Sequence, residues 1–284
     1  MTGLLACVLC SAASITPVSP PPPPPLTHGA GALAAARQIA ALGPRPATSA
    51  SERRAHRFVR RAFDRAGLAV TVQRFAVPGR GRSRNVIGVL DTPRRCLRIA
   101  MAHTDTTAPG PGANDNASGV GVVVALAKRL RQLDPHCDVW LVATGAEERI
   151  YTGSPDHLGA LALARRARAR GGRTRLRFAL SLDEVGRDRP FWLRSPARAP
   201  RAGVEGALLR AGRRAGVNAV WVHDEGTGNS DHREFELLGL PAAKLGVGAG
   251  GEPCRHMPCD TPDRLDRHSL ALAQRLAERA LTAP

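Results

Sequence analysis

The stretch HTDTTAPGPGANDNASG, residues 103–119, places one histidine, His103, and two aspartates, Asp105 and Asp115, among several glycines. It follows the apolar run CLRIAMAH, which predicts a buried strand. Imidazole nitrogen and carboxylate oxygen are both zinc ligands. A loop this rich in glycine has little rigidity of its own, so we expect a bound metal ion to hold these side chains in place.

Further acidic side chains and a second histidine follow later apolar runs. Glu147 and Glu148 come after DVWLVATG, Asp183 ends RLRFALSLD, and His256 lies in the loop CRHMPCDTPD. In an open α/β sheet the carboxyl ends of the strands meet at one edge, where sites form. Several carboxylates there would repel one another unless a cation lay among them. They outnumber the ligands that one zinc needs, which indicates two metal ions that share a carboxylate.

Each of these signals is weak when taken alone. Adjacent acids such as Glu147 and Glu148 usually lie on a solvated surface, a single loop histidine such as His256 usually makes an ordinary hydrogen bond, and Asp183 could cap a helix. The set is distinguished by position, because each cluster follows a predicted strand end of the same parallel array.

Strand and helix patterns alternate through the middle of the chain. The strand that ends at His103 is followed by a helical pattern over residues 117–133, a strand over 138–145, a helix over 154–169 and a strand over 175–183. Such alternation favours an α/β fold of three layers, with helices on both faces of a mixed, mostly parallel sheet. Further segments complete the expected order: helices at 30–43, 49–68, 230–239 and from 266, and strands at 68–77, 84–91, 218–224 and 241–248.

Basic residues outnumber acidic ones, with 41 Lys and Arg against 24 Asp and Glu and a formal net charge of +17. Such a balance can indicate nucleic acid or an anionic surface as partner. Lysine occurs only at Lys128 and Lys244, so the charge is almost all arginine, spread along a chain rich in Ala, Gly and Pro. A nucleic-acid groove would also need aromatic side chains near the basic residues, and aromatics make up only 4%. The composition therefore argues against a nucleic-acid partner.

The N-terminal region has a different composition. Residues 1–14, which include Cys7 and Cys10, resemble a secretory signal peptide without its basic n-region, although a mis-chosen start codon or a disordered tail would read the same way. The proline run that follows favours an extended tether. We expect residues 1–28 to be a signal and disordered tether, residues 29–284 to form a single domain, and the protein to be extracellular or in the cell envelope. No other stretch has about 18 consecutive apolar residues, so no membrane span is expected.

Six motifs, taken together and in order, resemble the two-zinc aminopeptidases, a family of zinc exopeptidases that also includes glutaminyl cyclases and glutamate carboxypeptidases. The motifs are AHTDT, GANDNASG, ATGAEE followed by GS, SLDEVG, SDHREFELLGLP and HMPCDTPDRLD. Singly, none of them would be specific. The resemblance covers residues 29–284 and implies a single zinc exopeptidase domain over that range.

The resemblance implies a set of metal ligands, residue by residue. His103 and Asp183 would bind one zinc ion, Glu148 and His256 would bind the other, and Asp115 would bridge both. The cofactors would then be two zinc ions per chain.

Two further acids have implied roles beside the ligands. Glu147 would be the general base, which takes a proton from the attacking water and returns it to the leaving amine. Asp105, two residues after His103, would fix the tautomer and tilt of that imidazole ring. The family also commonly has a cis peptide bond after the bridging aspartate, here between Asp115 and Asn116.

A third histidine, His232, competes for a metal role because it lies in the polar stretch GNSDHREF. The family has a similar Ser-Asp-His stretch near its substrate pocket rather than among its metal ligands. We therefore expect Ser230, Asp231 and His232 to line the pocket or to support it.

The cysteines that follow the N-terminal region predict two disulfides. Cys254 and Cys259 flank His256 and could join it in a structural zinc site, but the local sequence offers no fourth ligand, so a disulfide between them is favoured. Cys96 and Cys137 each precede a strand. Those strands should be parallel neighbours about 4.8 Å apart, which is within reach of disulfide geometry.

The resemblance implies a zinc aminopeptidase that removes the first residue, preferably an apolar one, from a peptide with a free N-terminus. We expect it to act as a monomer. Alternatives with the same fold are a glutaminyl cyclase with one zinc ion and a carboxypeptidase that holds a substrate carboxylate with arginine. Outside the enzymes, a basic binding module would keep the fold without turnover, but the complete set of expected ligands argues against it.

Overall fold

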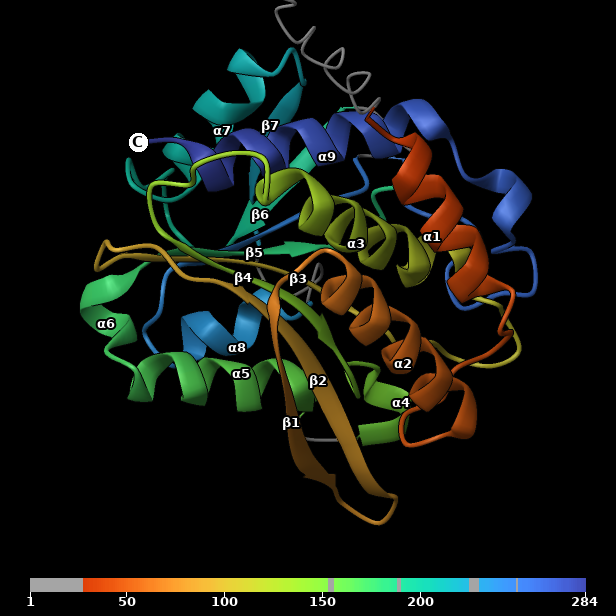
Figure 1. Ribbon diagram of the computed structural model, residues 1–284. Helices are drawn as coiled ribbons and strands as arrows, with labels where there is room; N and C mark the ends of the chain where they lie inside the picture. The colour runs from red at the N-terminus through yellow and green to blue at the C-terminus, as the bar shows by residue number, and fades with distance from the viewer. Residues whose placement is uncertain (1–27, 153–155, 188–189, 225–229, 249) are drawn as a thin grey trace, which may run out of the picture.

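The computed structural model describes residues 28–152, 156–187, 190–224, 230–248 and 250–284. The expected signal and tether, with Cys7 and Cys10, therefore lie outside the described residues, except for His28. The strands are β1 (Ala69–Val77), β2 (Gly81–Leu90), β3 (Leu97–His103), β4 (Asp138–Thr144), β5 (Leu176–Leu182), β6 (Phe191–Ser195), β7 (Ala219–His223) and β8 (Ala242–Gly246). They form one eight-stranded sheet in the order β1-β2-β4-β3-β5-β8-β6-β7 (Figure 1).

The centre of the sheet is parallel and its margins are mixed. Strands β4, β3, β5 and β8 run parallel to one another, and nearly all of their residues are buried. Their continuous apolar sequences suit a sheet that is covered on both faces. Strand β2 runs antiparallel to β1 and β4, and β6 runs antiparallel to β8. The predicted mixed, mostly parallel sheet is confirmed, although β6 lies in a segment where the sequence patterns predicted no element.

Helices cover both faces of the sheet (Figure 1). One face packs against α1 (Ala30–Ala40), α2 (Ala50–Arg65), α3 (Gly119–Leu130), α7 (Glu205–Arg214) and α9 (Arg267–Thr282). The other face packs against α5 (Leu158–Ala169) and α8 (His232–Leu237). The remaining helical turns are short: α4 (Arg149–Thr152), α6 (Gly172–Arg175), η1 (Ala113–Ser118) and η2 (Pro262–Arg264). Within the described ranges, no helix is long and apolar enough to span a membrane.

Helix α5 begins later than the sequence predicts. The pattern placed its start at residue 154, but the helix begins at Leu158, and residues 153–155 lie outside the described ranges. The amides of His157 and Leu158 donate to the carbonyl oxygens of Glu147 and Ala146, at 3.2 and 2.9 Å. These bonds tie the start of the helix to the loop after β4, and Asp156 and His157 lie outside the helix.

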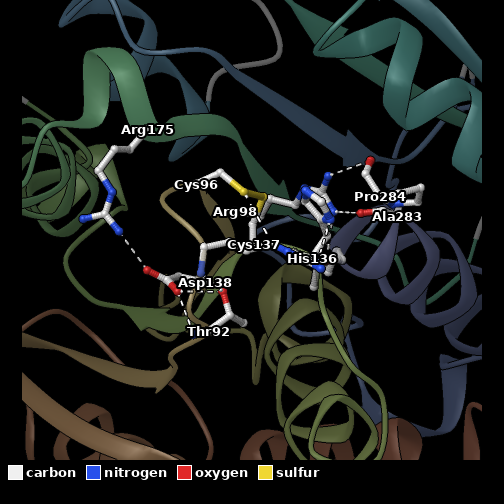
Figure 2. Close-up of a disulfide and its surroundings, with 11 residues drawn as sticks. Thr92, Cys96, Arg98, His136, Cys137, Asp138, Arg175, Ala283 and Pro284 are labelled. Atoms are coloured by element: carbon white, nitrogen blue, oxygen red, sulfur yellow. Dashed lines mark hydrogen bonds and ion pairs between the residues drawn. A yellow bond between two sulfur atoms is a disulfide. The ribbon is translucent and has the colours of Figure 1, made fainter.

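Both predicted disulfides are present. Cys96 and Cys137, with Cα atoms 4.8 Å apart, precede β3 and β4, whose first residues are paired in the sheet (Figure 2). Because 41 positions separate these cysteines, the restriction of the unfolded chain contributes about 4 kcal/mol of stability. Cys254 and Cys259 are only 5 positions apart, so the same effect contributes about 2 kcal/mol there. The main effect of the second disulfide is to restrict the loop that carries His256.

Candidate metal centre and active site

Three neighbouring strands bring polar residues to one edge of the sheet. Strand β3 ends at His103, which pairs with Thr144 at the end of β4, and β5 ends one residue before Asp183. Glu147 and Glu148 lie on the loop that follows β4. His103, Asp183 and both glutamates are buried. The structure thus brings together the polar strand ends that the sequence placed at one edge.

Asp115 lies between two imidazoles. Its Oδ1 is 3.2 Å from Nε2 of His103, and its Oδ2 is 3.2 Å from Nε2 of His256. The same nitrogen of His103 lies 3.4 Å from Oδ1 of Asp183, and that of His256 lies 3.1 Å from Oε2 of Glu148. Each imidazole therefore contacts Asp115 and one further carboxylate.

These contacts define two sets of three side chains that share Asp115. One set is His103, Asp115 and Asp183, and the other is Asp115, Glu148 and His256. In each set the ligand atoms lie within 4.8 Å of one another. Nitrogen and oxygen donors of this kind suit zinc, and a carboxylate common to both sets is typical of two-metal sites. The donor chemistry therefore fits two metal ions held by these five residues.

The charges of the two sets are strongly coupled. Burial alone would raise the pKa of Asp115, but hydrogen bonds from His103 and His256 lower it well below its usual range. Hydrogen bonds to Asp115 and Glu148 raise the pKa of His256 to about 10. Burial and the charge of Asp115 raise the pKa of Glu148 to about 8. The buried acids therefore need positive charge among them, which protons on the imidazoles or metal ions can supply.

The glycine-rich loop, which the sequence suggested a bound metal ion would hold, is also held by contacts within the protein. The carboxylate of Asp260 accepts the amides of Asn114 and Asp115 at 2.7 and 3.0 Å. The buried guanidinium of Arg45 donates to the carbonyl oxygens of Pro111 and Gly112 at 2.6 and 3.0 Å. No sequence pattern had singled out Arg45.

Close packing explains the glycines and the backbone shape of this loop. A Cβ on Gly119 would lie 2.1 Å from the carbonyl oxygen of Leu182, so only glycine lets the chain pass the end of β5 here. Gly112 has φ 58°, in the left-handed region that favours glycine. The peptide bond between Asp115 and Asn116 is cis, as the resemblance implied.

Asp105 contacts different groups from those expected. Nδ1 of His103 lies 3.1 Å from the main-chain carbonyl oxygen of Asp105, not from its carboxylate. The carboxylate instead accepts the amides of Glu147 at 3.0 Å and Glu148 at 3.1 Å. The main chain of Asp105 thus orients the imidazole, while its side chain holds the loop that carries the two glutamates.

A histidine that the sequence reasoning missed contacts Glu147. Nε2 of His157 lies 3.3 Å from Oε1 of Glu147, and Nδ1 lies 3.4 Å from Oε1 of Glu234. Burial would lower the pKa of His157, but the charge of Glu147 and hydrogen bonds to both glutamates raise it to about 10. Its place in an apparent helix pattern concealed this residue, because α5 begins one position later.

A buried lysine and an arginine also face the centre. Nζ of Lys244, on β8, lies 2.8 Å from Oδ2 of Asp183 and 3.7 Å from Glu184. The guanidinium of Arg255, next to His256, pairs with Glu184. Sequence reasoning assigned these residues no role, because a single lysine in an apolar strand gives no chemical pattern.

Ser230, Asp231 and His232 are buried beside the strand ends. The hydroxyl of Ser230 lies 3.0 Å from that of Ser181 on β5, and Asp231 accepts a 2.5 Å hydrogen bond from Thr144 on β4. Nε2 of His232 lies 3.1 Å from Asp224. These contacts support the strand ends, and none of the three residues belongs to the two sets that share Asp115.

Comparisons with known proteins agree with this architecture. The sequence model of one protein family, Peptidase family M28, matches residues 85–281 of this chain. No curated protein matches the chain in sequence.

Solved structures with the same fold include aminopeptidases and cyclases. A zinc aminopeptidase from Bacillus subtilis matches with a TM-score of 0.80 and 17% identity, over 89% of this chain and 94% of that chain. A leucine aminopeptidase precursor from Bacteroides thetaiotaomicron matches with a TM-score of 0.79 and 21% identity, over 92% of this chain and 98% of that chain. A glutaminyl cyclase from the same organism matches with a TM-score of 0.78 and 21% identity, over 92% of this chain and 99% of that chain. These likenesses confirm the predicted fold.

The raised pKa of His256 predicts how metal binding depends on pH. With a pKa of about 10 in the metal-free chain, this imidazole is protonated at neutral pH and must lose its proton before it can bind a metal ion. Zinc affinity should therefore rise as the pH is raised from about 6 to about 8, by about tenfold per pH unit for each proton displaced. Competition with a fluorescent chelator measures this dependence.

The matched controls for this titration are two histidine variants. His256→Gln should bind zinc more weakly and with a shallower pH dependence, whereas His136→Gln, which lies before β4 and so at the other end of that strand from Glu148, should behave as the parent protein. An affinity that does not change with pH would contradict the assignment of His256.

Proposed function

The chain belongs to peptidase family M28, and we propose that it is a zinc-dependent aminopeptidase that holds two zinc ions and removes the first residue of a peptide. The observation that carries this proposal is the position of Asp115, whose two oxygens each lie 3.2 Å from an imidazole, one of His103 and one of His256. A buried carboxylate shared in this way suits the bridging ligand of a metal pair.

The ligands would divide between the two ions. His103 and Asp183 would hold one, Glu148 and His256 the other, and Asp115 both. When bound, zinc supplies positive charge that lowers the pKa of water and polarises a carbonyl oxygen. That charge would also replace the protons that the imidazoles carry in the metal-free chain.

Glu147 is the residue best placed to move a proton. It adjoins Glu148 but stands outside the two sets that share Asp115. Its amide is bound by Asp105, and its Oε1 lies 3.3 Å from Nε2 of His157. The carboxylate would accept a proton from the attacking water and then deliver it to the nitrogen of the leaving amine.

Acids outnumber bases at this centre despite the +17 charge of the chain. Asp115, Glu147, Glu148 and Asp183 are all buried there. An α-ammonium group would be attracted to these carboxylates, and a peptide that ends there would place its first carbonyl beside the ligand sets. The preference for an apolar first residue rests on the family and on the mostly apolar nature of ligand pockets.

The proposal extends to the rest of the chain. Residues 29–284 would act as one catalytic domain and as a monomer, and residues 1–28 as an export signal and tether. The two disulfides favour an oxidising compartment, because such bonds persist outside the cytosol. We therefore place the protein outside the cell or in its envelope.

Glutamine substitutions at two adjacent positions should separate catalysis from metal binding. Glu147→Gln removes the proton acceptor but keeps the shape, so it should retain zinc and lose activity by about 10²–10⁴-fold. Glu148→Gln, the matched control, removes a ligand charge and should lose zinc affinity. Zinc content and kcat/KM of both variants measure the difference. Activity of Glu147→Gln within about threefold of the parent would place the base elsewhere.

A pair of chromogenic substrates tests the reaction. Leucyl p-nitroanilide should be hydrolysed in the presence of zinc and not after chelation, while its N-acetylated form should resist, because the acetyl group removes the charge of the α-ammonium. Equal cleavage of both compounds would show that the enzyme is not an aminopeptidase. If neither is cut but a glutaminyl peptide cyclises, the protein is a glutaminyl cyclase.

A further inference from the structure

A second cavity lies at the edge of the sheet opposite the metal centre. It has a volume of about 360 Å³ and is lined by the arginines Arg98, Arg177, Arg210, Arg214 and Arg279; we call it the arginine pocket. Arg98 is the second residue of β3, and His103 is the last. The five residue steps from Arg98 to His103 span about 16 Å of strand, so the two sites are separate.

Positive charge predominates in the arginine pocket. Its described lining contains no aspartate or glutamate side chain, and its acidic group is the terminal carboxylate of Pro284, one oxygen of which lies 3.5 Å from Nη2 of Arg98. Over the described ranges, no ion pair engages Arg177, Arg214 or Arg279. The acids of the surrounding elements α9, α7 and β4 pair with other bases: Glu278 with Arg129, Glu205 with Arg201, and Asp138 with Arg175.

The floor of the arginine pocket is rigid. Arg98 is only 7% exposed, and its Nη1 donates to the carbonyl oxygens of Leu281 and Ala283 at 3.1 and 2.5 Å (Figure 2). Its Nε is buried without a hydrogen-bond partner in the described structure. Arg98 pairs with Phe178 between β3 and β5, so Arg177 lies next to its strand partner, and burial and the charge of Arg177 lower the pKa of Arg98.

The rim of the pocket is formed by four exposed arginines. Arg177, Arg210, Arg214 and Arg279 are exposed and stand on β5, α7 and α9. Cys137 also lines the pocket, so the Cys96–Cys137 disulfide fixes its remaining wall (Figure 2). Four exposed guanidinium groups therefore stand around the buried Arg98.

We propose that the arginine pocket binds a small molecule that carries two or more phosphate or sulfate groups. Guanidinium groups present paired N–H donors that match the oxygens of such anions. The cavity volume lies at the lower end of the range of small-molecule sites, which is about 300–1,000 Å³. An anion with several charged groups would contact several of the rim arginines at once.

Calorimetric titration of the zinc-loaded full chain with trimetaphosphate, a cyclic anion with three phosphate groups, tests the proposal. One equivalent should bind, and the Arg177→Glu/Arg214→Glu double variant should bind at least about tenfold more weakly. Arg54→Glu/Arg61→Glu on α2 is the matched control: it changes the net charge equally at exposed positions outside the pocket. Its affinity should stay within about threefold of the parent, because a general field effect is weaker than direct contact.

Three further measurements make the result specific. Ala207→Trp, which fills the pocket without changing its charge, should also weaken binding, and unchanged peptidase activity and melting temperature show that the variants are folded. Sulfate, with one anionic group, should bind at least about tenfold more weakly than trimetaphosphate. Because phosphate can also contact zinc, binding should persist after chelation. Absence of binding, equal loss in both double variants, or loss on chelation would overturn the proposal.

Discussion

The contact between Asp115 and two imidazoles is the constraint on which the rest of the centre depends. One carboxylate oxygen faces His103, at the end of a central strand, and the other faces His256, on a loop near the C-terminus. A buried carboxylate between two bases is stable only if its charge is compensated, and other buried acids surround it. The centre therefore requires positive charge beside Asp115, which protonated imidazoles or metal ions can supply.

The surrounding structure holds that carboxylate and its neighbours from several directions. Asp260 and Arg45 bind the main chain of the glycine-rich loop, so Asp115 is positioned without help from its own flexible sequence. Asp105 binds the amides of the two glutamates, and Lys244 contacts Asp183. These four acids, Asp115, Asp183, Glu147 and Glu148, are thus each held by a contact with a residue outside the two ligand sets. Such support keeps a reactive geometry in place between one reaction and the next.

Acidic and basic side chains gather at opposite ends of the parallel strands. The carboxyl ends of β3, β4 and β5 collect acids and imidazoles, whereas the opposite edge, where β3 and β5 begin, carries Arg98 and Arg177. A chain of high net positive charge can therefore contain an acid-rich centre. Charge counted over the whole sequence says little about either edge.

The sequence predicted what depends on local patterns. Long apolar runs placed β3, β4 and β5, and the polar residues that follow each run placed His103, Asp183 and the two glutamates at one edge. The Cys96–Cys137 disulfide followed from strand adjacency, and Cys254–Cys259 followed from the lack of a fourth zinc ligand nearby. Prediction failed where long-range packing decides the outcome.

Particular residues show why. Arg45 lies in a proline-rich turn and Lys244 within an apolar strand, and only the folded chain brings them to the loop and to Asp183. The sequence pattern placed His157 within a helix. Its contact with Glu147 could not be predicted, because it joins two segments that no periodicity links. Asp105 was singled out by its spacing from His103, but the contacts of its carboxylate and its carbonyl oxygen depend on backbone geometry that spacing does not encode.

The most direct measurement of the central claim is anomalous X-ray diffraction at the zinc edge from crystals of the zinc-loaded protein. The account predicts two peaks, one beside His103 and Asp183 and one beside Glu148 and His256, with Asp115 contacting both. A single peak, or two peaks of which only one contacts Asp115, would contradict it.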